Sequence, residues 1–228
     1  MKLGIVTDEI SLNAKPGQFI MVYLPSGELL LPRPISICET TSDYMEIVYA
    51  VVGKGTELLS LIHKGQTIKV LGPLGTSFNY DNYKRVALVG GGVGIPPLLF
   101  TAKVLALNGI TTDAYLGFRS DAFLVERFTS TANAVFVTTE DGSFGTRGLI
   151  TDIFQSQNYD AIMACGPLPL LKVLAKKAEN IPCQVSMEQR MACGIGTCVG
   201  CVVKVNGSYV RVCTEGPVFF ANQVFMDS

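Results

Sequence analysis

The sequence contains a single histidine, no tryptophan and few charged residues. His63 is the only histidine among 228 residues. This excludes catalytic triads built on histidine, metal sites with two histidines, and Rieske clusters, which also need two. His63 itself ends the run "ELLSLIH", where a position at the end of a helix is expected. The chemistry of the chain must therefore come from other side chains or from bound cofactors.

Low charge and the absence of a long uninterrupted apolar run exclude further classes of protein. The formal net charge is −1, so no basic surface for nucleic acid or for an anionic membrane is expected. The most apolar stretch, residues 86–110, contains five glycines, two prolines and a lysine. A buried strand, loop and helix explain it better than a transmembrane helix. The start "MKLGIVTDEI" lacks the features of a signal peptide, so a cytoplasmic protein is expected.

Cysteine is the residue type whose distribution is most informative. The chain has seven, an odd number, and four of them lie close to the C-terminus. This argues against a disulfide framework and for a metal site or redox chemistry. The segment "RMACGIGTCVGC" spaces Cys193, Cys198 and Cys201 as C-x4-C-x2-C, and Cys213 follows in "RVCTEG". That is the spacing of plant-type ferredoxins, which hold a [2Fe–2S] cluster on four thiolates.

The glycines of this loop support the same interpretation. Gly194, Gly196 and Gly200 would let the backbone wrap closely and point N–H groups at the sulfurs. Two alternatives are a structural zinc site and a redox-active dithiol at Cys198 and Cys201. A dithiol leaves the other two cysteines and the glycines unexplained. Cys38 and Cys183 each stand alone in the sequence and are expected to be ordinary buried thiols.

Three successive patterns predict the fold, which is multidomain, β followed by α/β. Residues 1–82 carry short β-rich runs between Gly/Pro turns, with one short helix, and predict an antiparallel β-barrel. Residues 83–181 carry four strand–helix units and predict a parallel sheet with helices on both faces. Residues 182–228 predict a small cluster-binding segment with a β-ribbon that turns at Asn206-Gly207.

Four short motifs in the first pattern, followed by a nucleotide-type domain, carry a resemblance to a known family. They are "PGQF" (16–19), "RPIS" (33–36), "GKGT" (53–56) and "GPLG" (72–75). With the cysteine loop, the chain resembles the ferredoxin reductase superfamily from end to end. Within it, the chain is most similar to the electron transfer subunits of class 1B dihydroorotate dehydrogenases. About fifteen residues precede "PGQF", where relatives usually carry two strands, so one barrel strand is expected to be missing or supplied from elsewhere.

The resemblance implies an FAD site in the barrel domain. Arg33 would hold the FAD pyrophosphate, and Ser36 would hydrogen-bond near the reactive ring nitrogen. The amides of Gly55 and Thr56 would hold phosphate. The residues expected to lie along the isoalloxazine ring are Pro34, Ile35, Val48, Tyr49 and Ala50.

The run "VALVGGGVGIPPLL" places a Gly-rich turn between a strand and a helix, where a pyrophosphate can approach backbone amides. Gly91, Gly92 and Gly94 are the candidate contacts. The resemblance also implies that Cys165 and Gly166, in "ACGPLPLL", lie beside the nicotinamide ring; a buried structural cysteine is the alternative. The polar loop "TTEDGSFGTRG" ends another strand, where ligands usually bind. Asp121 would repel a 2′-phosphate and Arg119 would attract one, and the resemblance favours NAD.

The expected function is therefore electron transfer between NAD(H), FAD and a [2Fe–2S] cluster ligated by Cys193, Cys198, Cys201 and Cys213. No side chain is needed as a general acid or base. The resemblance implies an FMN-containing dihydroorotate dehydrogenase catalytic subunit as partner, in a heterotetramer with two copies of each chain, in pyrimidine biosynthesis. The alternatives are the similar subunit of a sulfide dehydrogenase, transhydrogenase or hydrogenase. An alternative from a different functional class is a nucleotide-sensing or scaffold module whose cysteines hold zinc.

Overall fold

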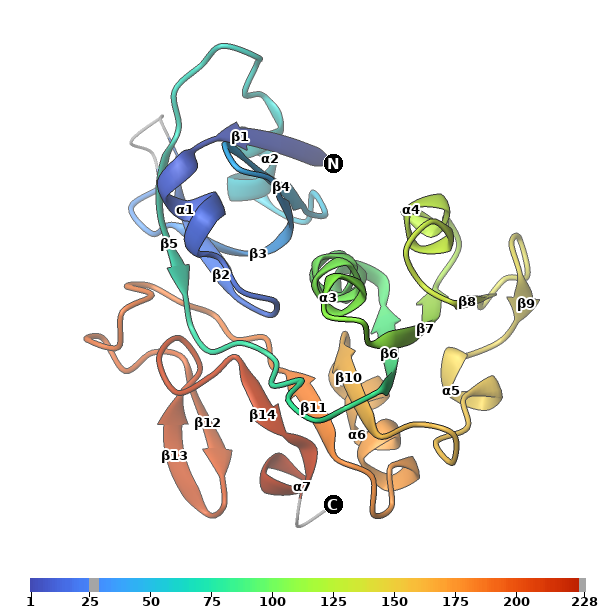
Figure 1. Ribbon diagram of the computed structural model, residues 1–228. Coiled ribbons are helices and arrows are strands. Elements are labelled where there is room, and N and C mark those ends of the chain that lie inside the picture. The colour runs from blue at the N-terminus through green and yellow to red at the C-terminus, as the bar shows by residue number, and fades with distance from the viewer. Residues whose placement is uncertain (25–28, 226–228) are drawn as a thin grey trace.

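A computed structural model describes residues 1–24 and 29–225 of the chain. The expected barrel segment 1–82 and cluster segment 182–228 each include residues that lie outside this range. Two sheets and a small ribbon organise the described residues (Figure 1).

The N-terminal sheet is an antiparallel half-barrel. Its strands lie in the order β1-β4-β3-β2-β5, with β1 and β5 as its edges. Helix α1 (Asp8–Asn13) lies between β1 and β2 in the chain, so a single strand precedes Pro16 and Gly17. Helix α2 (Lys54–Ser60) is the predicted short helix. The strands are β1 (Lys2–Val6), β2 (Phe19–Tyr23), β3 (Arg33–Thr40), β4 (Tyr44–Val48) and β5 (Lys69–Leu74).

The second sheet has seven strands in the order β14-β11-β10-β6-β7-β8-β9, all parallel to their neighbours except β14. This confirms the predicted parallel sheet. Strand β6 is central, and the chain adds β7 to β9 on one side of it before returning to add β10 on the other. The strands are β6 (Arg85–Gly91), β7 (Thr111–Phe118), β8 (Ala134–Thr139), β9 (Thr146–Arg147), β10 (Ala161–Cys165), β11 (Cys183–Ser186) and β14 (Val218–Phe220).

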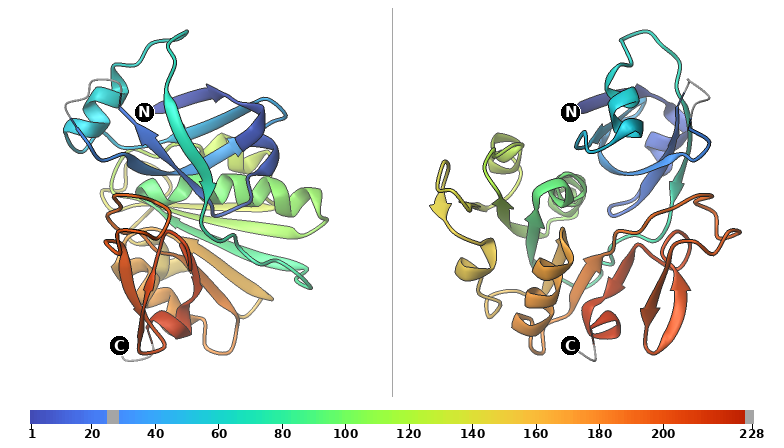
Figure 2. Two further views of the ribbon diagram at one scale, coloured as in Figure 1. Left: turned by 90° about the vertical axis from the view of Figure 1, so that its left-hand side faces the viewer. Right: turned by 180° about the vertical axis from the view of Figure 1, so that it is seen from behind.

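Helices cover both faces of this sheet, as the alternating pattern predicts (Figure 2). Buried side chains of α3 and α4 pack on one face, and those of α5 and α6 pack on the other. Two helices are shorter than the runs expected to form them, "DAFLVERF" (121–128) and "GLITDIFQSQ" (148–157), since α4 and α5 each form only about one turn. The helices are α3 (Ile95–Leu107), preceded by the 3₁₀ turn η1 (Gly92–Gly94), α4 (Val125–Thr129), α5 (Ile150–Ile153), α6 (Leu168–Lys177) and α7 (Ala221–Val224).

The C-terminal region supplies the predicted ribbon and also part of the large sheet. Strands β12 (Val202–Val205) and β13 (Ser208–Arg211) pair around a turn in which Asn206 and Gly207 both have positive φ. Such a turn matches the twist of a two-stranded ribbon, and Asn and Gly tolerate it best. Strands β11 and β14 complete the seven-stranded sheet. The expected division at residue 181 stays a prediction.

The described part of the chain contains no helix that is long and apolar enough to cross a membrane.

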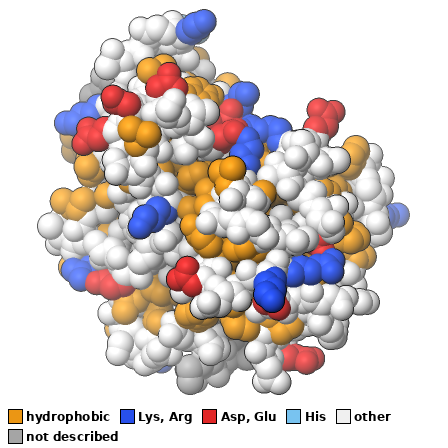
Figure 3. All heavy atoms as spheres, viewed as in Figure 1, with side chains coloured by type: hydrophobic (Ala, Val, Ile, Leu, Met, Phe, Trp, Pro, Cys, Tyr) orange, Lys and Arg blue, Asp and Glu red, His pale blue; other side chains and the backbone are white. Residues whose placement is uncertain are grey.

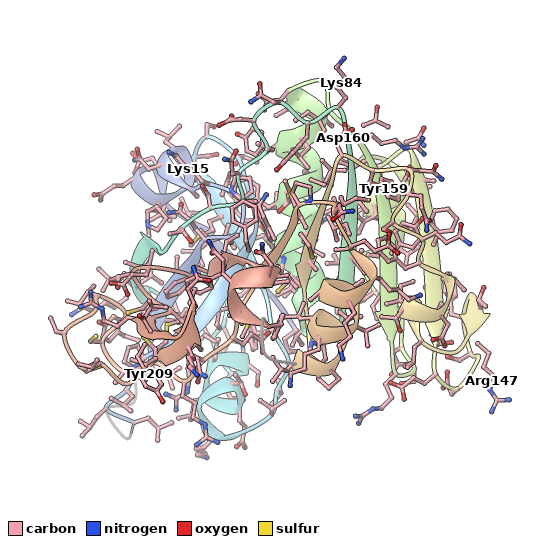
Figure 4. All side chains as sticks on the ribbon, turned by 90° about the horizontal axis from the view of Figure 1, so that it is seen from below. Lys15, Lys84, Arg147, Tyr159, Asp160 and Tyr209 are labelled. Carbon is pink, nitrogen blue, oxygen red and sulfur yellow. The ribbon has the colours of Figure 1, made fainter. Side chains whose placement is uncertain are left out.

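Asp113, at the N-terminal edge of the parallel sheet, is the most completely hydrogen-bonded buried carboxylate of this domain. It accepts hydrogen bonds from Arg85 Nη2 at 2.6 Å, Asn133 Nδ2 at 2.8 Å and Tyr159 Oη at 3.0 Å. Tyr159 lies at the same edge as Lys84 and Asp160 (Figure 4). Burial alone would raise the pKa of Asp113, yet these donors hold it below its ordinary value.

A carboxyl whose pKa is lowered on folding stabilises the fold above its unfolded pKa, and this contribution is lost as the pH falls through the folded pKa. We therefore expect the free energy of unfolding to decrease from about pH 4 downward, near the ordinary pKa of aspartate. Asp113→Asn should lower stability at pH 7 and flatten this acid dependence. Urea denaturation of both proteins between pH 3 and 7 measures it. Parallel curves for the two proteins would contradict the assignment.

Candidate functional site

The four cysteines near the C-terminus come together as two pairs. The side chains of Cys193 and Cys198 interact with one another, as do those of Cys201 and Cys213. The charge on Cys193 also acts on Cys213, so the pairs are neighbours. Cys201 and Cys213 are buried, whereas Cys198 is exposed. Cys38 and Cys183 are isolated buried thiols, which confirms their predicted role.

Donors of the loop itself surround the first pair. The Cys193 sulfur accepts from the Thr197 side chain and from the backbone N–H groups of Cys198 and Ile195, and these bonds lower its pKa to about 5. The backbone N–H of Gly196 points to Cys213. Gly194 and Gly196 both have positive φ, which turns these amides inward. The loop therefore stabilises the thiolate of Cys193, the form that binds metal, whereas burial and the neighbouring Cys201 raise the pKa of Cys213 to about 11.

The arrangement in pairs fits a cluster better than a single ion. A tetrahedral zinc needs four donors around one centre. A [2Fe–2S] cluster needs two thiolates at each of two irons, which is the pairing seen here.

The cysteine loop packs against the half-barrel. A Cβ added to Gly194 would lie 2.6 Å from Met21 Cγ on β2 and 3.2 Å from Leu74 Cδ1 on β5. Met21 is paired with Pro34 of the adjacent strand β3. Neighbouring strands are about 4.8 Å apart, so one strand separates the loop from the "RPIS" motif. Nothing in the sequence indicated this contact.

The motifs "RPIS", on β3, and "GKGT", at the start of α2, lie against one another although they are seventeen residues apart in the chain. The Arg33 guanidinium lies on Gly55, where an added Cβ would come within 2.5 Å of Cζ and Nη2. Gly55 is in helix α2, where alanine would otherwise be preferred. The glycine is thus explained by the close approach of Arg33. The Thr56 hydroxyl accepts from the Val52 and Gly53 amides. Gly55 and Thr56 lie in the first turn of α2, where backbone N–H groups have no partner within the helix.

The remaining flavin candidates line up along two paired strands. Pro34, Ile35 and Ser36 follow Arg33 on β3, and Ser36 and Pro34 are partly exposed. Val48 ends β4, and Tyr49 and Ala50 follow it. Val51 and Val52 come next, with 47% and 85% of their surfaces exposed. These two apolar residues were not among the predicted contacts, although their position in the same run marks them.

The glycine turn and the "ACGP" corner meet at the point where the strand order of the parallel sheet reverses. Gly91 ends β6 and Cys165 ends β10, and these strands are adjacent. An alanine Cβ at Gly94 would contact the carbonyl group of Cys165 and lie 2.5 Å from the Gly166 nitrogen. Ligands of open α/β sheets bind outside the carboxyl ends of the strands at such a point.

Cys165 is buried beneath this corner. Burial raises the pKa of its thiol to about 12, and the Glu188 carboxylate acts in the same direction, while a hydrogen bond from Ser186 opposes them. Glu188 is accessible to solvent, yet the surrounding protein desolvates its carboxyl and raises its pKa. Cys165 is thus a neutral thiol. Glu188, two residues beyond β11, is a site residue that the sequence patterns did not single out.

The polar loop after β8 lies against the end of β7. The Asp141 amide donates to the Arg119 carbonyl at 3.4 Å, and Ser143 Oγ donates to the Ser120 carbonyl at 3.3 Å. Arg147, in β9, lies away from Tyr159 and Asp160, toward the carboxyl ends of the strands (Figure 4). Both predicted nucleotide loops therefore share one edge.

Comparison with known proteins gives matches along the whole chain. The family described as the iron–sulfur cluster binding domain of dihydroorotate dehydrogenase B matches residues 188–225. The chain is 43% identical over 217 residues to the dihydroorotate dehydrogenase B (NAD(+)) electron transfer subunit of Caldanaerobacter subterraneus subsp. tengcongensis, covering 92% of this chain and 86% of the relative. The subunit of the same name from Clostridium acetobutylicum is 39% identical, with 94% and 88% covered.

A solved structure is also closely similar. It comes from work on flavin-based electron bifurcation in an NADH-dependent reduced ferredoxin-NADP oxidoreductase. It superposes with a TM-score of 0.88 at 35% identity, covering 98% of this chain and 84% of that one. The fold is therefore that of the ferredoxin reductases with a C-terminal iron–sulfur segment. These similarities favour the cluster over the zinc alternative.

Proposed function

The chain belongs to the family of dihydroorotate dehydrogenase B electron transfer subunits, and from this premise we propose that it carries electrons between an FMN-containing dihydroorotate dehydrogenase subunit and NAD+. The observation that carries the proposal is the packing of the cysteine loop on β2, one strand from "RPIS". Sites for a one-electron carrier and for a flavin would then be neighbours. In this role the chain serves pyrimidine biosynthesis.

When bound, FAD supplies the exchange between hydride transfer and single-electron transfer, and the [2Fe–2S] cluster supplies the one-electron relay. Residues 1–82 would hold the flavin, with Arg33 and the Gly55 and Thr56 amides at its phosphates. Ser36 would hydrogen-bond the ring, and Pro34, Ile35, Val48, Tyr49 and Ala50 would line it. No side chain needs to act as an acid or base.

Residues 182–228 would hold the cluster through Cys193, Cys198, Cys201 and Cys213. The amides of Ile195 and Gly196 point at sulfurs of the loop. Hydrogen bonds of this kind stabilise thiolates and tune the cluster. Because Cys198 is exposed, the Cys193/Cys198 side of the loop is the one open to a partner.

Residues 83–181 would bind NAD, with Gly91, Gly92 and Gly94 at its pyrophosphate and Cys165 and Gly166 at the nicotinamide. Support comes from the contact between Gly94 and Cys165 at the switch point of the sheet. Cys165 is a neutral thiol, so it would position the ring without adding charge. Asp121, beyond the end of β7, would disfavour a 2′-phosphate and Arg119 would favour one, so the proposal of NAD over NADP rests on the NAD(+)-linked relatives.

Gly94→Ala tests the nucleotide corner. Gly94 has φ −80° and ψ −8°, which alanine adopts freely, so the only penalty is the contact with the Cys165 and Gly166 backbone. Overpacking of this kind costs about 1–3 kcal/mol. We expect NADH affinity to fall roughly tenfold or more, since 1.4 kcal/mol corresponds to a factor of ten. Titration of the purified chain with NADH measures it.

Val93→Ala is the matched control. Val93 lies in the same turn with 48% of its surface exposed, so NADH affinity should stay unchanged. Equal affinities of the Gly94→Ala and wild-type chains would contradict the placement of the nucleotide at this corner.

The partner would approach the cysteine loop. Exposed apolar residues flank Cys198, since Ile195 and Val199 are 53% and 59% exposed. Exposed apolar groups beside a redox centre suit a protein interface. We propose a heterotetramer with two copies of each chain, located in the cytoplasm, where cysteine thiols remain reduced.

A second candidate is the corresponding subunit of a transhydrogenase, sulfide dehydrogenase or hydrogenase. Among these three, the similarity to the NADH-dependent reduced ferredoxin-NADP oxidoreductase favours the transhydrogenase. The two candidates share all three cofactor sites and differ in the partner. Mixing the purified chain with an FMN-containing dihydroorotate dehydrogenase subunit should produce dihydroorotate-dependent reduction of NAD+. Absence of this activity from a stably formed complex would favour the second candidate.

A further inference from the structure

Four charged side chains join the half-barrel to the helices of the parallel-sheet domain. The Glu39 carboxylate, on β3, accepts from Lys103 of α3 and from Arg127 of α4. Arg127 Nη1 also donates to Glu46 Oε1, on β4, at 2.5 Å. We call Glu39, Glu46, Lys103 and Arg127 the interdomain ion-pair cluster. Basic and acidic side chains are seen next to one another where the half-barrel meets the helices (Figure 3).

These ion pairs are shielded from solvent. The side chains of Glu46, Glu39 and Arg127 are 4%, 19% and 28% exposed. Burial alone would raise the pKa of Glu46, but the hydrogen bonds and charge of Arg127 hold it below its ordinary value. Exposed ion pairs contribute little to stability, whereas removing one partner of a buried pair leaves an uncompensated charge. Arg127 therefore matters to the geometry of this contact.

The cluster lies on the strands and helices that carry the candidate cofactor residues. Glu39 is six residues beyond Arg33 on β3, and Glu46 precedes Val48 on β4. Lys103 is on α3, which begins immediately after Gly94. The cluster thus links β3 and β4, which carry candidate flavin residues, to α3, which starts at the glycine turn proposed to bind the nucleotide.

Apolar packing alone would not fix this arrangement. Phe100 of α3 is buried in the half-barrel core, and Val104 packs against it. Apolar contacts are non-directional, so they permit a helix to slide or rotate over a sheet. Arg127 bridges carboxylates on two adjacent strands and has a fixed fork of donors, which specifies one position.

We propose that Arg127, with Lys103, Glu39 and Glu46, acts as a set of positioning residues that hold the nicotinamide corner at the distance from the flavin strands needed for hydride transfer. This inference rests on the proposed function. A shift of about 1 Å at a reacting centre can cost on the order of 100-fold in rate. The proposal predicts a larger defect in the NADH–flavin step than in the flavin–cluster step. Gly194 of the cysteine loop packs directly on Met21 and Leu74 of the half-barrel, although β11 and β14 also join this segment to the parallel sheet.

The test compares Arg127→Gln with Lys2→Gln in the full-length, FAD-loaded protein. Lys2 pairs with the same Glu46 at 3.3 Å, but it lies on β1, so this control removes a cation from Glu46 without affecting the interdomain contact. In Arg127→Gln, flavin reduction at saturating NADH should slow about 10–100-fold. Reduction of the flavin and the cluster by dithionite, which does not involve the nicotinamide corner, should be unchanged, Lys2→Gln should match wild type, and Arg127→Lys should restore part of the rate.

A second measurement does not depend on bound cofactor. Hydrogen–deuterium exchange of the FAD-free chain should increase in β3 and α4 in Arg127→Gln and stay unchanged in Lys2→Gln. If Arg127→Gln folds poorly, Lys103→Gln can be used in its place. Because Lys103 is more exposed, this variant should show the same pattern to a smaller degree.

If NADH reduces the flavin of the wild-type protein, and Arg127→Gln and Lys103→Gln react at the wild-type rate, the positioning role is overturned. The proposed function is then left intact. A wild-type, FAD-loaded protein that NADH does not reduce would overturn both. Equal slowing of the NADH step and the dithionite step would also overturn the positioning role, since it would indicate a general loss of structure.

Discussion

Replacing Cys213 with serine is expected to remove iron and acid-labile sulfide from the protein and to abolish electron transfer to the partner. Cys213 is buried, pairs with Cys201, and accepts a hydrogen bond from the Gly196 amide. A serine hydroxyl is a far weaker ligand for iron than a thiolate, which is the ligand that these clusters require. Iron and sulfide analysis, with the visible spectrum of the anaerobically purified protein, measures the loss.

The same variant should keep its flavin and its reaction with NADH, because neither the "RPIS" strand nor the glycine turn depends on Cys213. Cys183→Ser is the matched control, since Cys183 is also buried but stands alone in β11. It should retain its iron and sulfide. A Cys213→Ser protein with the iron and sulfide content of wild type would contradict the ligand assignment.

Adding one methyl group at Gly55 is expected to weaken FAD binding strongly. In a helix, alanine is more favourable than glycine by about 1 kcal/mol, so Gly55→Ala should not harm α2 by itself. Its Cβ would instead occupy the space of the Arg33 guanidinium. A charge-assisted hydrogen bond contributes about 1.5–3 kcal/mol, so displacing Arg33 from the pyrophosphate should raise the Kd for FAD roughly 10- to 100-fold. Fluorescence titration of the FAD-free chain measures it.

Gly53→Ala is the control for this experiment. Gly53 has an extended backbone, and an added Cβ meets no atom within 4 Å. Its FAD affinity should equal that of wild type, while Arg33→Ala should reproduce the loss seen in Gly55→Ala. Unchanged affinity in both Gly55→Ala and Arg33→Ala would show that FAD binds without Arg33.

The cysteine site could be predicted because its information is local. Three of the four proposed ligands and the glycines of the loop lie within twelve residues, so their spacing alone indicates a cluster. The ribbon was predicted for the same reason, because Asn206 and Gly207 supply the two positive φ values of its turn. The strand–helix alternation likewise predicted the parallel sheet and the faces of its helices.

Features that depend on distant contacts were not predictable. Strand β14 has three residues and joins the large sheet only by pairing with β11, which a short run cannot signal. The runs expected to form full helices after β7 and β8 give only α4 and α5. Tertiary context overrides helix propensity in such short segments.

The contacts between residues of different motifs also could not be predicted from the sequence. Gly194 against Met21, Gly55 against Arg33 and Arg127 against Glu39 join residues of different motifs or domains. None of these residues has a local pattern that indicates its distant partner. Their joint arrangement, which brings the candidate cofactor residues of the three segments together, is visible only in the folded chain.

The most direct test of the account is anaerobic reduction by NADH of two forms of the protein, one loaded with FAD and one depleted of it, followed by visible absorption and electron paramagnetic resonance. The account predicts that NADH bleaches the flavin and produces the signal of a reduced [2Fe–2S] cluster in the loaded form, and produces no cluster signal in the depleted form. A colourless protein that contains zinc would contradict it. So would a cluster that NADH reduces equally well without FAD.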